Sequence, residues 1–334
     1  MLLCDCWCVG LDFTRSSGAV ACFMHEGKKT MRKTLLIAAV CLAAACSSNE
    51  GQEGVAMQPS VLDLSGYSSE KPAEPVDLLF IHHSTGGHLL AEKGEAVGDN
   101  CIYATHPNGG GLRKMLEENN YIVHEASYGS LVGDKTDICH WNAKFRDHMD
   151  KVLTCRHQDE FFTDGTKNRI VMFKSCYPNN RIESDGDGPG DPDSCELTTA
   201  NCKAAYLSLL GYFARQPETL FVVVTAPALV EPSVGIKGFI KSVLRPESSI
   251  DRVGIRARNF NNWLKDVENG WLKDYELNNV VVFDYYDILT GSGSSNWSMY
   301  PAGPRDSHPN SEGNSLAALE FVPFLNRALH RFGM

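Results

Sequence analysis

Five apolar runs of strand length, separated by segments of helical period, constrain the fold of this chain most strongly. The runs span residues 77–82, 121–125, 170–174, 220–225 and 280–284, and the helical segments span residues 112–118, 199–215, about 252–267 and 311–331. Continuous apolar runs are typical of strands buried on both faces, and crossover helices cover both faces of a parallel sheet. The sequence therefore predicts an α/β fold, a three-layer α/β/α sandwich with a five-stranded parallel sheet.

Composition argues against one class of partner. The chain has 334 residues, of which 43% are apolar, and a formal net charge of -10. Nucleic-acid-binding proteins usually display a concentrated basic face, whereas Lys and Arg here form no more than short pairs. We therefore expect no nucleic-acid partner. The length suits one large domain, and no interdomain linker is visible between residues 77 and 334.

The N-terminal part of the chain has the features of an export signal. Arg32 and Lys33 precede an apolar run over residues 35–45, and small residues then precede Cys46. This pattern resembles a bacterial lipoprotein signal, in which the cysteine is lipidated and becomes the new N-terminus. An apolar run of about eleven residues is too short to span a bilayer.

We therefore expect four regions. Residues 1–30 are a spurious extension before a start at Met31, residues 31–45 a signal peptide, residues 46–75 a flexible linker and residues 76–334 the folded domain. The expected product is an exported lipoprotein in the periplasm, the outer membrane or at the cell surface. Its contact with the membrane would be the lipid on Cys46 alone.

Six cysteines follow Cys46. They are Cys101, Cys139, Cys155, Cys176, Cys195 and Cys202. An even number in an exported chain is compatible with disulfides, but sequence alone does not select a pairing. Cys195 and Cys202 are nearest to each other in sequence, Cys139 and Cys155 are next, and buried free thiols are the alternative.

Polar residues gather where the predicted strands end. Ser84 follows the first strand, Gly129 and Gly133 follow the second, Tyr177, Asn179 and Asn180 follow the third, and Asp306 and His308 precede the last helix. Ligands of open parallel sheets bind outside the carboxyl ends of the strands. A serine is a weak nucleophile at neutral pH unless a base lies within hydrogen-bond reach. The pattern therefore predicts a Ser-His hydrolytic site, with Asp306 as the candidate acid.

This arrangement resembles the SGNH hydrolases, the GDSL-like esterase and lipase superfamily, over roughly residues 77–330. The most specific element is His308-Pro309-Asn310 with Gly313, which is similar to the DxxHPNxxG block of the family. The segments FKSCYPN and ARNFNNWL are similar to an uncharacterised branch of exported bacterial members. The resemblance implies a flavodoxin-like SGNH fold and ester hydrolysis without a cofactor. Many relatives remove acetyl groups from sugars, so extracytoplasmic carbohydrate esters are the expected substrates.

The resemblance also implies roles for individual residues. Ser84 would be the nucleophile, His308 the general base and Asp306 the acid that orients the imidazole. The oxyanion hole would consist of the backbone N–H groups of Ser84 and Gly133 and the side-chain amide of Asn179. Residues expected to contact the substrate are His83, Gly129 and Tyr177.

Several positions depart from the family pattern. His82-His83 replaces the Gly-Asp pair before the serine, and one residue instead of two separates Asp306 from His308. A backbone carbonyl is therefore an alternative partner for His308. Asn180 and Tyr177 are alternatives to Asn179, and Gly129 is an alternative to Gly133. These departures keep a second function open, a non-catalytic surface lipoprotein that binds a glycan or protein partner on the same fold.

We expect no metal site. His82, His83, His88 and His308 could suggest one, but adjacent residues of an extended segment point to opposite faces, so His82 and His83 cannot easily share an ion. An acidic loop offers Asp185, Asp187, Asp191 and Asp193. It lacks the spacing and the terminal Glu of an EF-hand, which favours a solvated loop.

Overall fold

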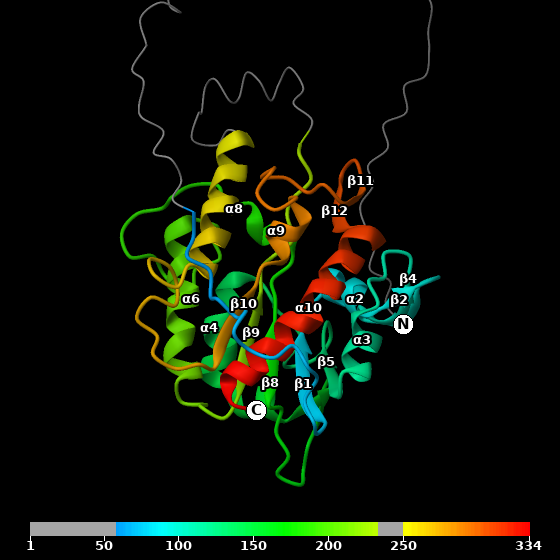
Figure 1. The fold of residues 1–334 in the computed structure, drawn as a ribbon. Coiled ribbons are helices and arrows are strands. Elements are labelled where there is room, and N and C mark those ends of the chain that lie inside the picture. Colours follow the sequence, from blue (N-terminus) through cyan, green and yellow to red (C-terminus); the bar gives the residue numbers. More distant parts are fainter. Residues whose placement is uncertain (1–57, 233–249) are drawn as a thin grey trace, which may run out of the picture. The chain divides into compact units, whose positions relative to one another are not determined.

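The computed structural model describes residues 58–232 and 250–334 (Figure 1). The expected N-terminal extension, the signal peptide and the lipidation of Cys46 lie outside these residues and stay predictions. Within them, a seven-stranded sheet has the order β10-β9-β8-β1-β5-β6-β7. Its strands are β1 (Val76–Ile81), β5 (Tyr121–Ala126), β6 (Cys155–His157), β7 (Glu160–Phe161), β8 (Ile170–Phe173), β9 (Leu220–Val224) and β10 (Val280–Phe283).

The sheet has the winding order of a flavodoxin-like fold. The five predicted strands, β1, β5, β8, β9 and β10, are all parallel, and β1 lies between β5 and β8. The chain therefore winds first to one side of β1 and then to the other, which creates a switch point between β1 and β8. The predicted fold class is confirmed. The sheet is wider than predicted because β6 adds in parallel to β5 and β7 pairs antiparallel with β6.

Two sets of helices cover the two faces of the sheet (Figure 1). On one face lie α2 (Ser84–Leu90), α3 (Leu112–Glu118), α9 (Tyr285–Leu289) and α10 (Ser311–Phe332), and on the other α4 (Ile138–Asp147), α5 (Met149–Thr154), α6 (Thr199–Phe213) and α8 (Ile250–Lys265). Leu78 and Phe80 of β1 enter the first core, and Leu79 and Ile81 enter the second. This alternation is the physical reason for the unbroken apolar runs. No helix in residues 58–232 and 250–334 combines the length and the apolar character needed to cross a membrane.

Smaller elements surround the carboxyl edge of the sheet. A three-stranded sheet consists of β2 (Glu92–Lys93), β3 (Val97–Asp99) and β4 (Ile102–His106), and a 3₁₀ helix, η1, spans Tyr177–Asn180. An antiparallel ribbon consists of β11 (Pro301–Gly303) and β12 (Asp306–Pro309) and leads directly into α10. These pieces were not predicted, because they are short and mostly exposed or half-buried and so lack the continuous apolar runs of the central strands.

The expected flexible linker, residues 46–75, ends earlier than predicted. Of its described part, Leu64 is buried in the core of the α10 face. The side-chain amides of Asn120 and Asn326 donate to the carbonyls of Pro72 and Ser69 at 2.7 and 2.8 Å. Residues from about 60 to 72 therefore pack on the folded domain. The polar composition of this segment favoured a flexible linker and gave no sign that part of it packs on the domain.

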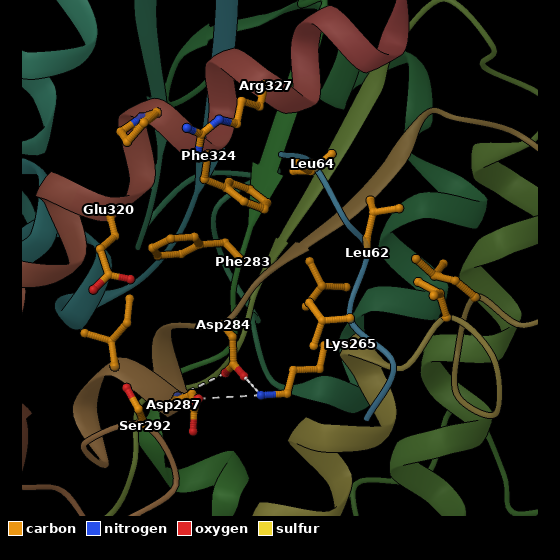
Figure 2. A pocket seen from close by; sticks show the side chains of 16 residues that line it. Leu62, Leu64, Lys265, Phe283, Asp284, Asp287, Ser292, Glu320, Phe324 and Arg327 are labelled. Carbon is orange, nitrogen blue, oxygen red and sulfur yellow. Dashed lines mark hydrogen bonds and ion pairs between the residues drawn. The ribbon is translucent and has the colours of Figure 1, made fainter. Parts of the chain in front are cut away.

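This N-terminal segment closes one side of a cavity of about 490 Å³ (Figure 2). Leu62, Leu64, Phe283 and Phe324 form an apolar wall. At the other end, the Lys265 ammonium lies 2.5 Å from the carboxylate of Asp284, which follows β10. Neither Ser84 nor His308 lines this cavity.

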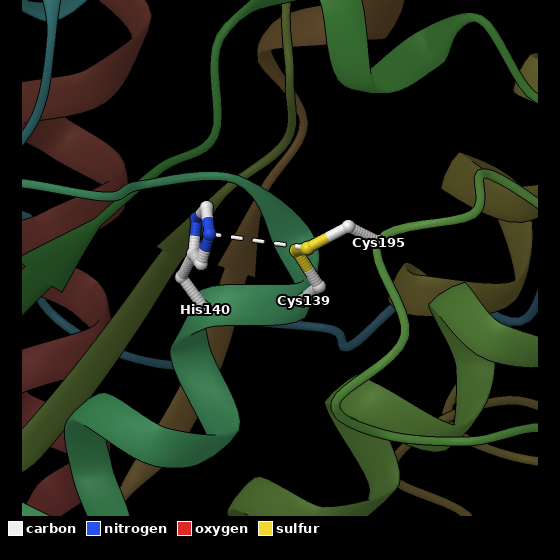
Figure 3. Close-up of side chains that lie close together, drawn as sticks. All are labelled: Cys139, His140 and Cys195. Atoms are coloured by element: carbon white, nitrogen blue, oxygen red, sulfur yellow. Dashed lines mark hydrogen bonds between the residues drawn. A yellow bond between two sulfur atoms is a disulfide. The ribbon is translucent and has the colours of Figure 1, made fainter.

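A disulfide joins Cys139 of α4 to Cys195 of the acidic loop (Figure 3). Sequence analysis had left the pairing open and had named Cys195 with Cys202 and Cys139 with Cys155 only as the couples nearest in sequence. The free thiols among the described residues are those of Cys101, Cys155, Cys176 and Cys202. His140 lies beside the disulfide, and it forms with Cys139 and Cys195 the one group of three potential metal ligands found in the described residues. Both sulfurs are already bonded to each other.

Candidate active site

Ser84 lies at the carboxyl edge of the sheet, at the switch point beside β1. It is the first residue of α2, three residues after β1 ends at Ile81. The turn into α2 depends on small residues, because a Cβ on Gly87 would lie 1.9 Å from the carbonyl oxygen of Cys101. The glycine pair after Ser84 therefore allows close packing against the β3–β4 segment. Ser84 itself stays half-buried at the rim.

The structure brings Ser84, His308 and Asp306 together, although 224 positions separate the first two. The Nε2 atom of His308 lies 3.0 Å from Ser84 Oγ. The Nδ1 atom of the same ring lies 2.6 Å from Asp306 Oδ1, and the backbone N–H of His308 donates to that oxygen at 3.0 Å. A serine hydroxyl, an imidazole and a carboxylate thus form one continuous chain, which is the geometry that general-base activation of a serine requires.

The short spacing between Asp306 and His308 follows from their secondary structure. Both belong to strand β12, in which residues two apart point to the same side. Ser307 points away and accepts a hydrogen bond from the backbone N–H of Val230 at 3.0 Å. The alternative of a backbone carbonyl as the partner of His308 is therefore not needed. Asn310 caps α10 by accepting from the N–H of Gly313 at 3.0 Å.

The surroundings of Asp306 favour the ionised form of its carboxyl group. Partial burial acts to raise its pKa, but the hydrogen bonds from the backbone and ring of His308 outweigh that effect, so the pKa lies below its usual value. An ionised carboxylate beside Nδ1 holds the imidazole with its Nε2 atom toward Ser84 and stabilises a protonated ring. The side chain of Asp306 is half exposed, so solvent screens part of this interaction.

Two of the expected oxyanion donors are engaged elsewhere. The N–H of Gly133 donates to Ser130 Oγ at 2.9 Å, and a Cβ on Gly133 would lie 2.1 Å from the carbonyl oxygen of Ser127. The side-chain amide of Asn179 donates to Asp137 Oδ1 at 2.8 Å and to the carbonyl of Cys176 at 3.3 Å. In this conformation both donors are therefore engaged within the loops around the site, and their expected roles in an oxyanion hole stay predictions.

The alternatives to these donors are also engaged. Asn180 is buried and donates to the carbonyls of Ala226 and Pro227 at 2.8 and 2.9 Å. The N–H of Gly129 donates to Asp134 Oδ1 at 2.8 Å, and its φ of 83° identifies a turn that favours glycine. Within residues 58–232 and 250–334, the N–H of Ser84 donates to no other group, so it is the one expected oxyanion donor left available.

Two tyrosine rings pack on the histidines that neighbour Ser84. Tyr177 lies edge-on to His308, with ring centroids 4.9 Å apart. Tyr128, which sequence analysis did not single out, stacks on His83 with centroids 3.6 Å apart and is 39% exposed. The Nε2 atom of His83 lies 2.9 Å from the carbonyl oxygen of Gly133 and donates to it, and burial lowers the pKa of this ring to about 4. Neutral His83 therefore supports the exposed ring of Tyr128.

A buried lysine lies behind the site and was also missed. Lys174 follows β8, has no exposed surface and donates to the hydroxyl of Thr85. The Thr85 hydroxyl is 3.5 Å from the sulfur of Cys176, and that sulfur is 3.6 Å from Ser84 Oγ. The available sequence signal was a charged residue directly after an apolar strand. Its proximity to Ser84 follows from the pairing of β1 with β8, which sequence does not show.

The remaining imidazoles near His308 are neutral at physiological pH. His88 stacks on His106 with centroids 3.8 Å apart and lies 5.2 Å from the His308 ring. Burial lowers the pKa of His88 to about 3, and it also lowers the pKa of His106. These rings form an uncharged wall beside the general-base candidate.

Comparison with known proteins gives distant structural relatives. No protein-family model matches the chain, and no curated protein sequence matches it. A carbohydrate esterase family 2 enzyme with a carbohydrate-binding domain from Corynascus thermopiles (Myceliophthora fergusii) is 11% identical, with a TM-score of 0.36 over 79% of this chain and 68% of that one. An acetylxylan esterase from Geobacillus stearothermophilus, solved as a catalytic mutant, is 13% identical, with a TM-score of 0.39 over 79% and 97%. At these values the function has to be inferred from the chain's own site.

Proposed function

We propose that this protein is a serine esterase that removes O-acyl groups, acetyl groups above all, from carbohydrate. The observation that carries the proposal is the contact of 3.0 Å between Ser84 Oγ and His308 Nε2, with Asp306 on the other ring nitrogen at 2.6 Å. The exposed ring of Tyr128 and the neighbouring Tyr177 offer apolar faces beside the nucleophile, which suit the faces of a sugar.

The proposed reaction has two halves. His308 accepts the proton of Ser84 Oγ as this oxygen attacks the ester carbonyl. The protonated ring then gives that proton to the sugar oxygen as its bond to the acyl carbon breaks, which leaves an acyl-serine and a free sugar hydroxyl. In the second half, His308 takes a proton from water, the hydroxide attacks the acyl-serine, and the acid is released as Ser84 regains its proton. Asp306 stays ionised throughout and stabilises the protonated ring. No cofactor takes part in these steps.

The proposed oxyanion hole has few available hydrogen-bond donors in this conformation. Each preorganised donor is worth about 3 kcal/mol in the barrier, so the N–H of Ser84 alone would support slow turnover. The internal bonds of Gly133 and Asn179 favour the second candidate function, a glycan-binding protein without turnover. A substrate that shifts either loop would release a further donor.

Labelling with a fluorophosphonate separates the two candidates. The esterase proposal expects covalent labelling of the wild type, none of Ser84→Ala, and hydrolysis of aryl acetates and acetylated xylo-oligosaccharides. Ser208→Ala is a matched control, since this serine lies on α6 and donates only to the carbonyl of Ala205. Folded wild type that resists the probe and binds acetylated glycan without hydrolysis would favour the binding protein.

We also propose that the protein is exported and anchored by a lipid on Cys46. The sequence pattern of residues 31–46 supports this, and so does the Cys139–Cys195 bond, since structural disulfides persist in oxidising compartments. Mass spectrometry of the N-terminal peptide from membrane fractions tests the proposal. An unmodified N-terminus at Met1 or Met31 would contradict it.

A further inference from the structure

A buried acid-imidazole pair lies directly beneath the turn that carries Ser84. The His82 ring has no exposed surface, and Glu125 of β5 is 2% exposed. The Nε2 atom of His82 lies 2.9 Å from Glu125 Oε1, and its Nδ1 atom lies 3.0 Å from the carbonyl oxygen of His83. The other oxygen of Glu125 pairs with the guanidinium of Arg113 on α3.

The partners of His82 determine its protonation. A carbonyl oxygen can only accept, so Nδ1 must donate to His83. Burial acts to raise the pKa of Glu125, but its contacts with His82 and Arg113 outweigh burial and lower it, so the carboxylate is ionised and also accepts. The geometry therefore places an acceptor at each ring nitrogen of His82, so both contacts are satisfied when both nitrogens donate.

The carbonyl that His82 holds is part of the turn at Ser84. The oxygen of His83 also accepts the N–H groups of Gly86 and Gly87, at 2.9 and 3.2 Å, so it closes the first turn of α2. The His82 ring lies where a side chain at position 86 would be, since a Cβ on Gly86 would come within 2.3 Å of the Cβ of His82. His82 thus contacts residues on both sides of Ser84, and Glu125 contacts His82.

We infer that Glu125 and His82 are positioning residues for Ser84, which hold the His83 carbonyl and thereby set the direction in which Ser84 Oγ faces His308. This rests on the proposed function. Burying an ion pair is seldom more stabilising than an apolar pair of the same volume, because both charges lose their hydration. Fold stability alone therefore does not explain why these two residues are present. The orientation of the His83 carbonyl does, because His82 contacts that carbonyl and Glu125 holds His82.

Variants of Glu125 test the inference. Glu125→Gln removes the charge, and Glu125→Asp keeps a carboxylate for Arg113 but withdraws it from His82. Misplacement of a reacting group by about 1 Å costs about 100-fold in rate, so we expect kcat and the rate of fluorophosphonate labelling to fall about 10- to 100-fold, with KM nearly unchanged. Nitrogen NMR of the His82 ring should show two protonated nitrogens in the wild type and one in Glu125→Gln.

A matched control lies on the same two strands. Asp77 of β1 faces His124 of β5 at 2.8 Å, at the amino end of β1 and away from Ser84. We expect Asp77→Asn to keep the kcat and labelling rate of the wild type. If Glu125→Gln does not fold, Glu125→Asp decides the question, since it leaves the ion pair with Arg113 possible.

The outcomes separate this inference from the proposed function. Folded Glu125 variants with wild-type kcat, or a neutral His82 ring in the wild type, would overturn the inference while the esterase proposal stands. Failure of Ser84 in the wild type to react with the probe would overturn the esterase proposal itself. Equal losses of kcat and labelling rate in Asp77→Asn and in the Glu125 variants would show that the pair only stabilises the sheet. That result would also overturn the inference.

Discussion

The buried Lys174 should give this protein an unusual dependence of stability on pH. Burial lowers the pKa of its ammonium to about 8, although attraction to Cys176 and Cys101 opposes the shift. The usual value of 10.5 applies in the unfolded chain. Between the two values, the unfolded state binds more protons than the native state. The free energy of unfolding should therefore rise as the pH increases from about 8 to 10.5.

The size of the effect follows from the shift in pKa. Each unit corresponds to about 1.4 kcal/mol, and integration of the two titrations from pH 7 to pH 9.5 gives about 2 kcal/mol. Lys174→Met keeps the length of the side chain and removes the charge, so the variant lacks this contribution. Groups that titrate in the same range without interacting with Lys174 are common to both proteins. Their contributions cancel in the difference between wild type and variant.

Urea unfolding at the two pH values measures that difference. We expect the stability of the wild type relative to Lys174→Met to increase by about 2 kcal/mol from pH 7 to pH 9.5, with equal m-values. A difference that stays constant between the two pH values would refute the reasoning, because it would place the Lys174 titration outside this window. A decrease would mean that the native state stabilises the ammonium.

Two further predictions concern the site and its surroundings. Asp306→Asn keeps the shape of the side chain but removes the charge that stabilises protonated His308. We expect kcat at pH 7 to fall about 100-fold, at the lower end of general-base contributions, and unchanged turnover of the folded variant would assign that role to another group. Cys139→Ser opens a loop closed across 56 positions and should lower the free energy of unfolding by about 4 kcal/mol in the loop-entropy model. Urea unfolding checks this, and equal midpoints for the variant and the oxidised wild type would contradict it.

Sequence analysis predicted the five parallel strands of the sheet because each strand is buried on both faces and is therefore a continuous apolar run. Each of the five apolar runs became a parallel strand within one or two residues, and the approach of Ser84 to His308 followed from the edge to which such strands lead. The ribbon that carries Asp306 and His308 was not foreseen. It explains why a spacing of two residues suffices where the family pattern has three.

The oxyanion donors could not be predicted because they depend on competing partners. Gly133 and Asn179 occupy the expected positions after their strands. However, the N–H of Gly133 donates to Ser130, and the side-chain amide of Asn179 donates to Asp137. Which acceptor such a donor meets depends on small differences in loop conformation, and sequence patterns do not show these. The same limit hid Lys174 and Glu125, whose partners lie on neighbouring strands and helices remote in sequence.

The β11–β12 ribbon carries both the proposed acid and the proposed base. Asp306 and His308 share one short strand, while Ser84 belongs to a helix fixed by the central sheet. A displacement of the ribbon would leave the carboxylate-imidazole contact intact and lengthen only the gap to the hydroxyl. The hydrogen bond from the Val230 N–H to Ser307 Oγ, at 3.0 Å, therefore bears on the distance between Ser84 and His308 and not on the contact between His308 and Asp306.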